Sequence, residues 1–174
     1  MDHSGDAAPP DTHEGEAANR RLIAAWIEAN VGGRVTGVQR LRRWRRVWRA
    51  EYERDGVARS ALVKGTRPWE SIPYSLGHEL RMNQILEANG IGVPHSYGMI
   101  EAPEAFVMDW APGDRDPGLV QQAIETASGM SPDRWEASLR YMDVLARMHR
   151  IPVEAFAGGE AGDPQGGLAI AMDD

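Results

Sequence analysis

Apolar residues first recur at helical spacing after residue 19. Asn19 is a suitable N-cap and Gly32-Gly33 provide a stop, so the sequence predicts a short amphipathic helix between them. Residues 1–18 show no periodicity and are rich in Asp, Glu, Ala, Gly, Pro and His. Such a composition buries too little apolar surface to offset the entropy of ordering, and we expect disorder there. The apolar positions of the helix are Leu22, Ile23, Trp26 and Ile27.

Residues 35–64 are predicted to form three strands. A helix is the alternative for the first part, because Leu41, Trp44, Trp48 and Tyr52 also fit helical spacing. The β-branched residues at 35, 36 and 38 oppose a helix, and the Asp55-Gly56 pair is a strong hairpin signal. We therefore expect strands at 35–41, 47–53 and 57–64, with a loop at 42–46.

One helix and two further strands follow. Ser75 is a suitable N-cap for a helix over 76–89, and Gly90 ends it. Extended segments are predicted around 95–100 and 105–110, with a turn at 102–104 between them. The apolar side of the helix consists of Leu76, Leu80, Ile85 and Leu86.

The composition becomes helical after the Pro- and Gly-containing cluster at 111–114, which marks a domain boundary. A weak helix is predicted over 119–127, and a stronger one begins at Ser131-Pro132, an N-cap followed by proline at the first helical position. Because the Gly- and acid-rich tail predicts no element to cover its apolar stripe, we expect self-association through the exposed helix at 132–149. The stripe consists of Trp135, Leu139, Met142, Leu145 and Met148.

Length and composition narrow the class of protein. The chain has 174 residues, 42% of them hydrophobic, no run of roughly 20 apolar residues and no secretory pattern at its N-terminus. It has no cysteine, which fits a reducing compartment, so we expect a cytoplasmic protein without membrane partners. The net charge of −7 argues against nucleic acid, although residues 34–54 contain eight arginines.

A lysine and a glutamate are the strongest candidates for chemistry. Lys64 closes an apolar predicted strand, and Glu79 lies on the helix that follows. A lysine in this position provides a movable charge for phosphates, and a carboxylate that pairs with it fixes its direction. The pair therefore predicts a phosphate clamp of the kinase type.

Five segments in order resemble the aminoglycoside phosphotransferase and choline-kinase-like family. The resemblance implies a kinase-like N-lobe at 19–112, namely a five-stranded antiparallel sheet with an inserted helix, followed by a truncated helical C-lobe segment at 113–152 and a tail at 153–174. The overall fold class is then α+β. The segments are Leu62-Val63-Lys64, His78-Glu79, Ile91-Gly92-Val93-Pro94, Phe106 to Gly113, and Leu145 to His149.

The resemblance implies that the lobe binds ATP, with Mg and a small hydroxylated acceptor in a full-length homologue. Lys64 and Glu79 would form the clamp, Met108 would lie along the adenine, and backbone groups near Asp109 and Trp110 would contact the base. Arginines stand where the family has small residues between its first two strands. Arg43 and Arg45 are therefore expected to replace backbone amides at the phosphates, or to belong to a substrate-facing surface.

The family's catalytic loop, His-Gly-Asp followed by Asn, and its metal-binding Asp do not occur after His149. We therefore expect a phosphotransferase fragment that binds nucleotide but is inactive alone, with no catalytic residue and no protein-only metal site. The alternative is a non-catalytic arginine- and tryptophan-rich module that binds phosphate-containing polymers by stacking on Trp44 and Trp48, or that binds a protein partner.

Overall fold

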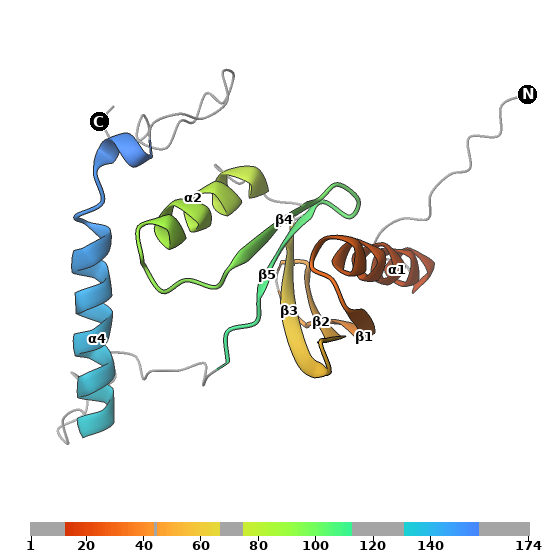
Figure 1. The fold of residues 1–174 in the computed structure, drawn as a ribbon, viewed down its shortest axis with the longest axis horizontal. Helices are drawn as coiled ribbons and strands as arrows, with labels where there is room; N and C mark the ends of the chain where they lie inside the picture. The colour runs from red at the N-terminus through yellow and green to blue at the C-terminus, as the bar shows by residue number, and fades with distance from the viewer. Residues whose placement is uncertain (1–12, 44, 67–74, 113–130, 157–174) are drawn as a thin grey trace, which may run out of the picture. The chain divides into compact units, whose positions relative to one another are not determined.

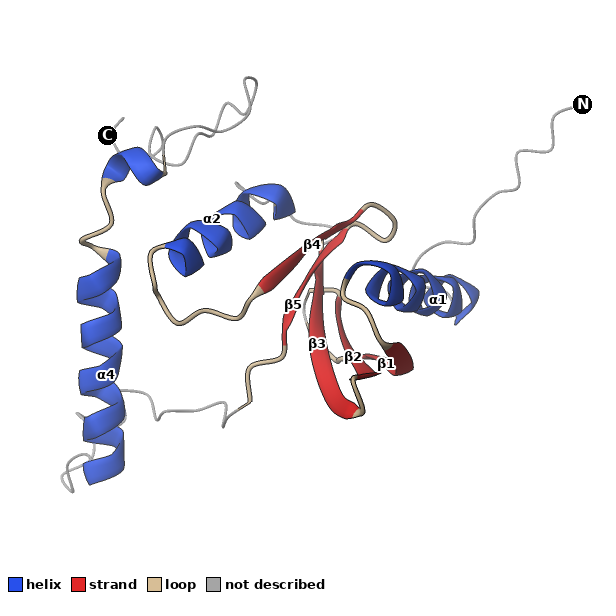
Figure 2. Cartoon of the chain, in the orientation of Figure 1, coloured by secondary structure: helices blue, strands red, loops and turns tan. Residues whose placement is uncertain are grey.

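The computed structural model describes residues 13–43, 45–66, 75–112 and 131–156, which form an α+β fold (Figures 1 and 2). The predicted five-stranded antiparallel sheet is confirmed, and the described residues contain three α-helices. In chain order the elements are α1 (His13–Asn30), β1 (Arg34–Arg40), β2 (Val47–Arg54), β3 (Val57–Gly65), α2 (Leu76–Ala88), β4 (Ser96–Ile100), β5 (Ala105–Asp109), α4 (Pro132–Met148) and the 3-10 turn η1 (Val153–Ala155).

The strands lie in the order β1-β2-β3-β5-β4, and every neighbouring pair is antiparallel. Asp55 and Gly56 both have positive φ and form the predicted tight turn between β2 and β3. The register shifts once in β1, between Val35 and Gly37, and once in β4, between Ser96 and Gly98. The helical alternative for the first part of residues 35–64 is therefore wrong.

The predicted helix caps are present. Ser75 Oγ accepts a hydrogen bond from the backbone N–H of His78 at 3.0 Å, and Ser131 Oγ accepts one from the N–H of Arg134 at 3.4 Å. Gly90 follows α2 with a φ of 72° and ends it as expected. The helix predicted at 119–127 lies outside the described residues.

The first helix begins earlier than its apolar spacing predicts. Residues 13–18 are part of α1, so the prediction of disorder is wrong from residue 13, and Asn19 is a buried interior residue rather than an N-cap. Polar contacts hold this first part: Glu16 accepts hydrogen bonds from the Trp48 indole N–H at 2.9 Å and from Arg20 at 3.0 Å. Hydrogen bonds between polar side chains cannot be predicted from the spacing of apolar residues.

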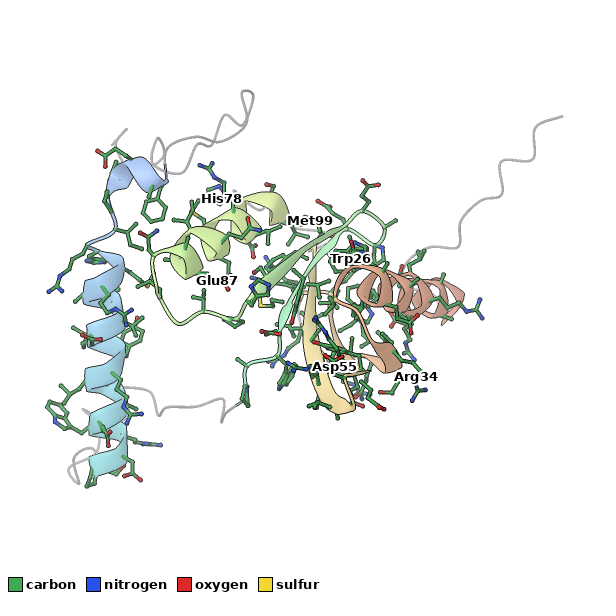
Figure 3. All side chains as sticks on the ribbon, in the orientation of Figure 1. Trp26, Arg34, Asp55, His78, Glu87 and Met99 are labelled. Atoms are coloured by element: carbon green, nitrogen blue, oxygen red, sulfur yellow. The ribbon has the colours of Figure 1, made fainter. Side chains whose placement is uncertain are left out.

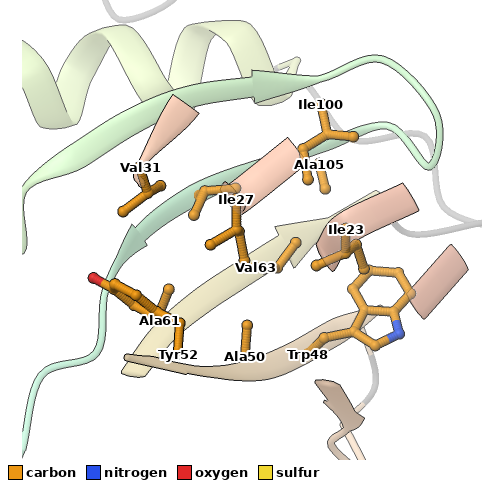
Figure 4. Close-up of a cluster of buried hydrophobic side chains, with 11 residues drawn as sticks. Ile23, Ile27, Val31, Trp48, Ala50, Tyr52, Ala61, Val63, Ile100 and Ala105 are labelled. Carbon is orange, nitrogen blue, oxygen red and sulfur yellow. The ribbon is translucent and has the colours of Figure 1, made fainter. Parts of the chain in front are cut away.

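The main core lies between α1 and one face of the sheet (Figure 4). Ile23 and Ile27 of α1, and Val31 directly after it, are buried against inward-facing residues of the strands. Trp48 is the largest of these and is fully buried. The strand residues of the cluster are Trp48, Ala50, Tyr52, Ala61, Val63, Ile100, Ala105 and Val107.

A smaller cluster covers part of the opposite face. Side chains alternate along β5, so Val107 faces the main core while Phe106 and Met108 face the other way. Leu76 and Leu80, in the first turns of α2, are buried against Phe106. Met99 of β4, labelled in Figure 3, packs against the same cluster.

The chain divides into two compact units, residues up to 81 with 94–110, and residues 82–93 with those from 111 onward. In the second unit, Arg147 of α4 donates a hydrogen bond to the backbone carbonyl of Gly90. Trp135, Leu139 and Met142 on the predicted stripe of α4 are more than half exposed. Among the described residues no helix is long and apolar enough to cross a membrane.

The glycine pair after α1 gives a test of the packing. Gly33 has a φ of 91°, and a Cβ there would lie 2.3 Å from the carbonyl oxygen of Glu53. Gly56 is also left-handed, with a φ of 74°, but a Cβ there meets nothing within 4 Å. We expect Gly56→Ala to lower the free energy of unfolding by about 1–2 kcal/mol and Gly33→Ala by about 3 kcal/mol, because the latter adds a backbone clash.

Urea unfolding of the two variants measures the difference. Gly92→Ala is a control, since Gly92 has neither a positive φ nor a neighbour within 4 Å of the added atom. Equal losses for Gly33→Ala and Gly56→Ala would show that the close approach of Gly33 to Glu53, near the end of β2, is absent.

Candidate functional site

Lys64 lies near the end of β3, on the face of the sheet opposite the main core. Its neighbours Val63 and Gly65 are buried on the core side, and strand alternation therefore directs Lys64 to the other face. The ammonium nitrogen lies 5.3 Å from the centre of the Phe106 ring, a distance at which a cation is attracted to an aromatic face. The Lys64 side chain is 31% exposed, so solvent reaches it.

Glu79 comes to Lys64 from the first turn of α2. The Ser75 cap fixes where the helix begins, and the burial of Leu76 and Leu80 against Phe106 fixes which side of the helix faces the sheet. Glu79 Oε2 lies 2.5 Å from Lys64 Nζ. The predicted ion pair is confirmed, and its role in binding a nucleotide remains a prediction.

A second cation binds the same carboxylate. Arg45 Nη2 donates to Glu79 Oε1 at 2.7 Å, and Arg45 Nη1 donates to Oε2 at 2.8 Å. The Arg45 side chain is only 7% exposed. Arg45 was expected to replace backbone amides at the phosphates or to belong to a substrate-facing surface, but in this structure its side chain is buried and both terminal nitrogens of its guanidinium are bound to Glu79.

The loop before β2 brings Arg45 to this position. In the β2–β3 hairpin Val47 lies opposite Lys64, so the residues just before Val47 lie beside the end of β3. The N–H of Gly65 donates to the carbonyl oxygen of Arg46 at 2.8 Å. A Cβ at Gly65 would lie 3.0 Å from the Trp48 ring and 3.2 Å from that carbonyl, so only a residue without a side chain fits here undisturbed.

The electrostatics of the three residues depend on Glu79. Burial by itself raises the pKa of this carboxyl group, but hydrogen bonds and charges from Arg45 and Lys64 outweigh it and lower the pKa from 4.5 to about 2. Glu79 is therefore ionised at neutral pH. With two cations and one anion, the group then carries a net charge of about +1.

The residues predicted to contact a base lie further along the same region. Met108 is half-buried on the Lys64 side of the sheet, and it lies opposite Leu62 of β3. Asp109 points its carboxylate to the other side, where Oδ1 accepts a hydrogen bond from the Tyr97 hydroxyl at 2.6 Å. Burial and this hydrogen bond raise the pKa of Tyr97 well above its ordinary value.

The amides of Asp109 and Trp110 are already used. The N–H of Asp109 donates to the His95 carbonyl at 2.8 Å, and that of Trp110 donates to the Ser60 carbonyl at 3.2 Å. The guanidinium of Arg49 also covers the Trp110 indole at 4.8 Å. In this conformation the two amides do not serve as donors to a base, and the contacts predicted near them would have to use other backbone groups.

The arginine- and tryptophan-rich segment does not form one exposed surface. Trp48 is fully buried, so the predicted stacking of nucleic-acid bases on Trp48 is wrong. The reason is that Trp48 points into the main core and its indole N–H is bound by Glu16, while Arg40 lies over its ring. Arg43 is exposed, and Trp44 lies outside the described residues.

One signal in the sequence singles out the site. The chain has 19 cationic residues, and Lys64 is its only lysine. A single lysine among so many arginines marks position 64 as one where the type of cation matters. The partnership of Arg45 with Glu79 has a weaker signal, namely that the Asp55-Gly56 turn fixes the hairpin register and so places residues 45 and 46 beside the end of β3.

Comparison of the chain with protein families, with curated proteins and with solved structures gives no match. Within the described ranges no group of three His, Asp or Glu side chains is placed to hold a metal ion.

The low pKa of Glu79 predicts how stability depends on pH. A carboxyl group whose pKa is lower in the folded state stabilises the fold above its unfolded pKa of about 4.5, and this contribution is lost as the pH falls toward 2. The shift corresponds to about 3 kcal/mol. We expect the free energy of unfolding to fall between pH 5 and pH 2 by up to about that amount from this group.

Urea unfolding across this pH range, compared between the wild-type protein and Glu79→Gln, isolates the contribution. The Gln variant should be less stable at pH 7 and should lose less stability on acidification. Glu51→Gln is a control at an exposed carboxylate of β2. Parallel pH profiles for wild type and Glu79→Gln would show that Glu79 is not held by the two cations.

Proposed function

We propose that residues 19–112 form a kinase-like nucleotide-binding lobe, similar to that of the aminoglycoside phosphotransferase and choline-kinase-like family. In this proposal Lys64 contacts the phosphates of ATP and Glu79 orients Lys64. The observation that carries it is the 2.5 Å contact between Lys64, on the third strand, and Glu79, on the helix that follows. A pair of this kind, from the same two elements, is a recurring part of protein kinases.

The charge of the group supports an anionic ligand. A lysine paired with one glutamate is neutral, whereas Lys64, Arg45 and Glu79 together carry about +1. Arg45 is the buried member and Lys64 is the accessible one. The accessible part of the positive charge is therefore the Lys64 ammonium group, which can turn its three donors toward phosphate oxygens.

The residue types support the same conclusion. Arginine is the cation everywhere else in this chain, including Arg45, where its planar fork matches a carboxylate. The only lysine, Lys64, is partly exposed to solvent. Its ammonium group is compact and its side chain is flexible, so it can adjust to a ligand. This division of roles fits a lysine that binds a ligand and an arginine that binds a protein group.

An apolar surface next to Lys64 fits the base of a nucleotide. Leu62 and Met108 are half-buried, lie opposite each other in the β3–β5 pair, and share the sheet face of Lys64. Partly exposed apolar side chains beside a cation suit a ligand that has a flat apolar part and an anionic part. ATP has both parts.

Phosphoryl transfer requires a base and Mg²⁺ ligands in addition to a phosphate clamp. The sequence contains no His-Gly-Asp segment. The described residues also lack a group of carboxylates that would hold Mg²⁺. We therefore propose nucleotide binding for residues 1–174 and derive no catalytic step.

We expect Lys64→Met to weaken binding of ATP at least tenfold, because it removes the only accessible cation of the group. The fold should remain nearly intact, since a partly exposed lysine contributes little to stability. Isothermal titration calorimetry measures the affinity, and thermal unfolding checks the fold. Arg59→Met, an exposed position on the same strand, controls for the loss of one positive charge.

ATP binding by the wild-type protein that is unchanged in Lys64→Met would contradict the proposal. Absence of ATP binding by the wild-type protein would contradict it as well.

The second expectation concerns catalysis. Purified residues 1–174 should not phosphorylate small hydroxylated acceptors in the presence of ATP and Mg²⁺, because the sequence contains no His-Gly-Asp segment to supply the base. Mass spectrometry of a mixture of amino-sugar and amino-alcohol acceptors after prolonged incubation tests this. Metal-dependent formation of a phosphorylated product that is lost in Lys64→Met would show that the chain contains a base we have not identified.

A further inference from the structure

We propose that Arg45 is a positioning residue that acts through Glu79 to orient Lys64 before a ligand binds. This inference rests on the proposed function, because Lys64 is taken as the residue that meets the phosphates. Arg45 itself is not proposed to touch the ligand. Its contribution is to hold both oxygens of the carboxylate that fixes the lysine.

The contacts of Glu79 are unequal in geometry. Arg45 binds both carboxylate oxygens, at 2.7 and 2.8 Å, whereas the ion pair with Lys64 is made by Oε2 at 2.5 Å. A two-point contact fixes the plane of a carboxylate, and a one-point contact leaves it free to rotate. Arg45 therefore determines where Oε2 lies, and Oε2 determines where Lys64 Nζ lies.

Burial points in the same direction. Exposure of the side chains rises from 7% for Arg45 to 22% for Glu79 and 31% for Lys64. The group is thus anchored at its buried end and open at its lysine end. A phosphate that arrives from solvent would meet Lys64, while Arg45 stays on the carboxylate.

The backbone next to Arg45 is itself fixed to β3. The carbonyl of Arg46 accepts the N–H of Gly65, the residue after Lys64, at 2.8 Å. The N–H of Leu41 donates to the carbonyl of Val47 at 2.8 Å and closes the loop that carries Arg45. The arginine and the lysine are therefore held to the same end of the sheet by main-chain hydrogen bonds, and Glu79 joins both to α2.

A double-mutant cycle separates this role from direct binding. The proteins are wild type, Arg45→Met, Glu79→Gln and the double variant, and the probes are ATP and inorganic tripolyphosphate in calorimetric titrations. If Arg45 acts through Glu79, Arg45→Met weakens binding about tenfold in the wild-type background and less than twofold in the Glu79→Gln background. An equal loss in both backgrounds would mean that Arg45 contributes charge or contacts the phosphates directly, and would overturn the proposal.

A conservative variant separates positioning from charge. Arg45→Lys keeps the positive charge but cannot make the two-point contact with Glu79. We expect it to bind tripolyphosphate more weakly than the wild-type protein does. Wild-type affinity in Arg45→Lys would show that charge alone is required, and would contradict a positioning role.

The single lysine supplies a readout that needs no ligand. Selective isotope labelling of lysine gives one side-chain NMR signal, that of Lys64. We expect this signal to shift in ligand-free Arg45→Met and to stay unchanged in the control Arg59→Met. An unchanged signal in Arg45→Met would overturn the inference even if ATP binds, whereas a shifted signal in a protein that does not bind ATP would contradict the proposed function alone.

Loss of the fold is a separate outcome that the cycle can recognise. Arg45→Met removes one of the two cations that bind the partly buried Glu79 carboxylate, so it is the variant that we expect to be least stable. The double variant removes the arginine and the carboxylate charge together and should be more stable than Arg45→Met alone. If Arg45→Met is unfolded, folded Arg45→Lys decides: it has two lysine signals, and the one that is missing from Arg45→Lys/Lys64→Arg is that of Lys64. A shift of that signal from the wild-type position supports positioning, and no shift opposes it.

Discussion

A carboxylate that is partly withdrawn from water needs positive charge close by, and Glu79 has two cations within hydrogen-bonding distance. This constraint connects three elements that are far apart in the sequence: the loop before β2, the end of β3 and the first turn of α2. Apolar packing places the helix, and main-chain hydrogen bonds place the loop beside the end of β3, yet these contacts alone do not specify how the loop and the helix meet. The ion pairs provide that specificity, because a shift of α2 by one residue would leave a charged group without its partners.

Much of the fold could be predicted from the sequence. The Asp55-Gly56 pair, the Ser75 and Ser131 caps and the Gly90 stop are local signals with a backbone cause, and each lies where it was expected. The start of α1 could not be predicted in this way. Its first turns depend on Glu16 reaching Trp48 and Arg40, residues more than twenty positions away, and the apolar pattern carries no record of such contacts.

In the candidate site, too, one part could be predicted from local signals and another part could not. The Lys64–Glu79 pair could be predicted, because a strand end and a helix start are both visible in the sequence and the two charges are complementary. The binding of Glu79 by Arg45 was missed, because several adjacent arginines in one loop look alike until the hairpin register is applied. Trp48 was misjudged for a related reason. A tryptophan close to several arginines resembles an exposed stacking surface, but strand alternation directs its ring into the main core and Arg49 to the opposite face.

The two register shifts in the sheet have a consequence for behaviour in solution. β1 and β4 are the outermost strands, and each carries one irregularity, near Gly37 and near Gly98. An outermost strand with regular spacing offers a row of unpaired backbone groups to a strand of another molecule. A bulge interrupts that row and increases the local twist, which opposes edge-to-edge pairing. In the part of the chain that the structure describes, each outermost strand thus carries an irregularity that opposes pairing with a strand of another copy, the first step toward a fibril.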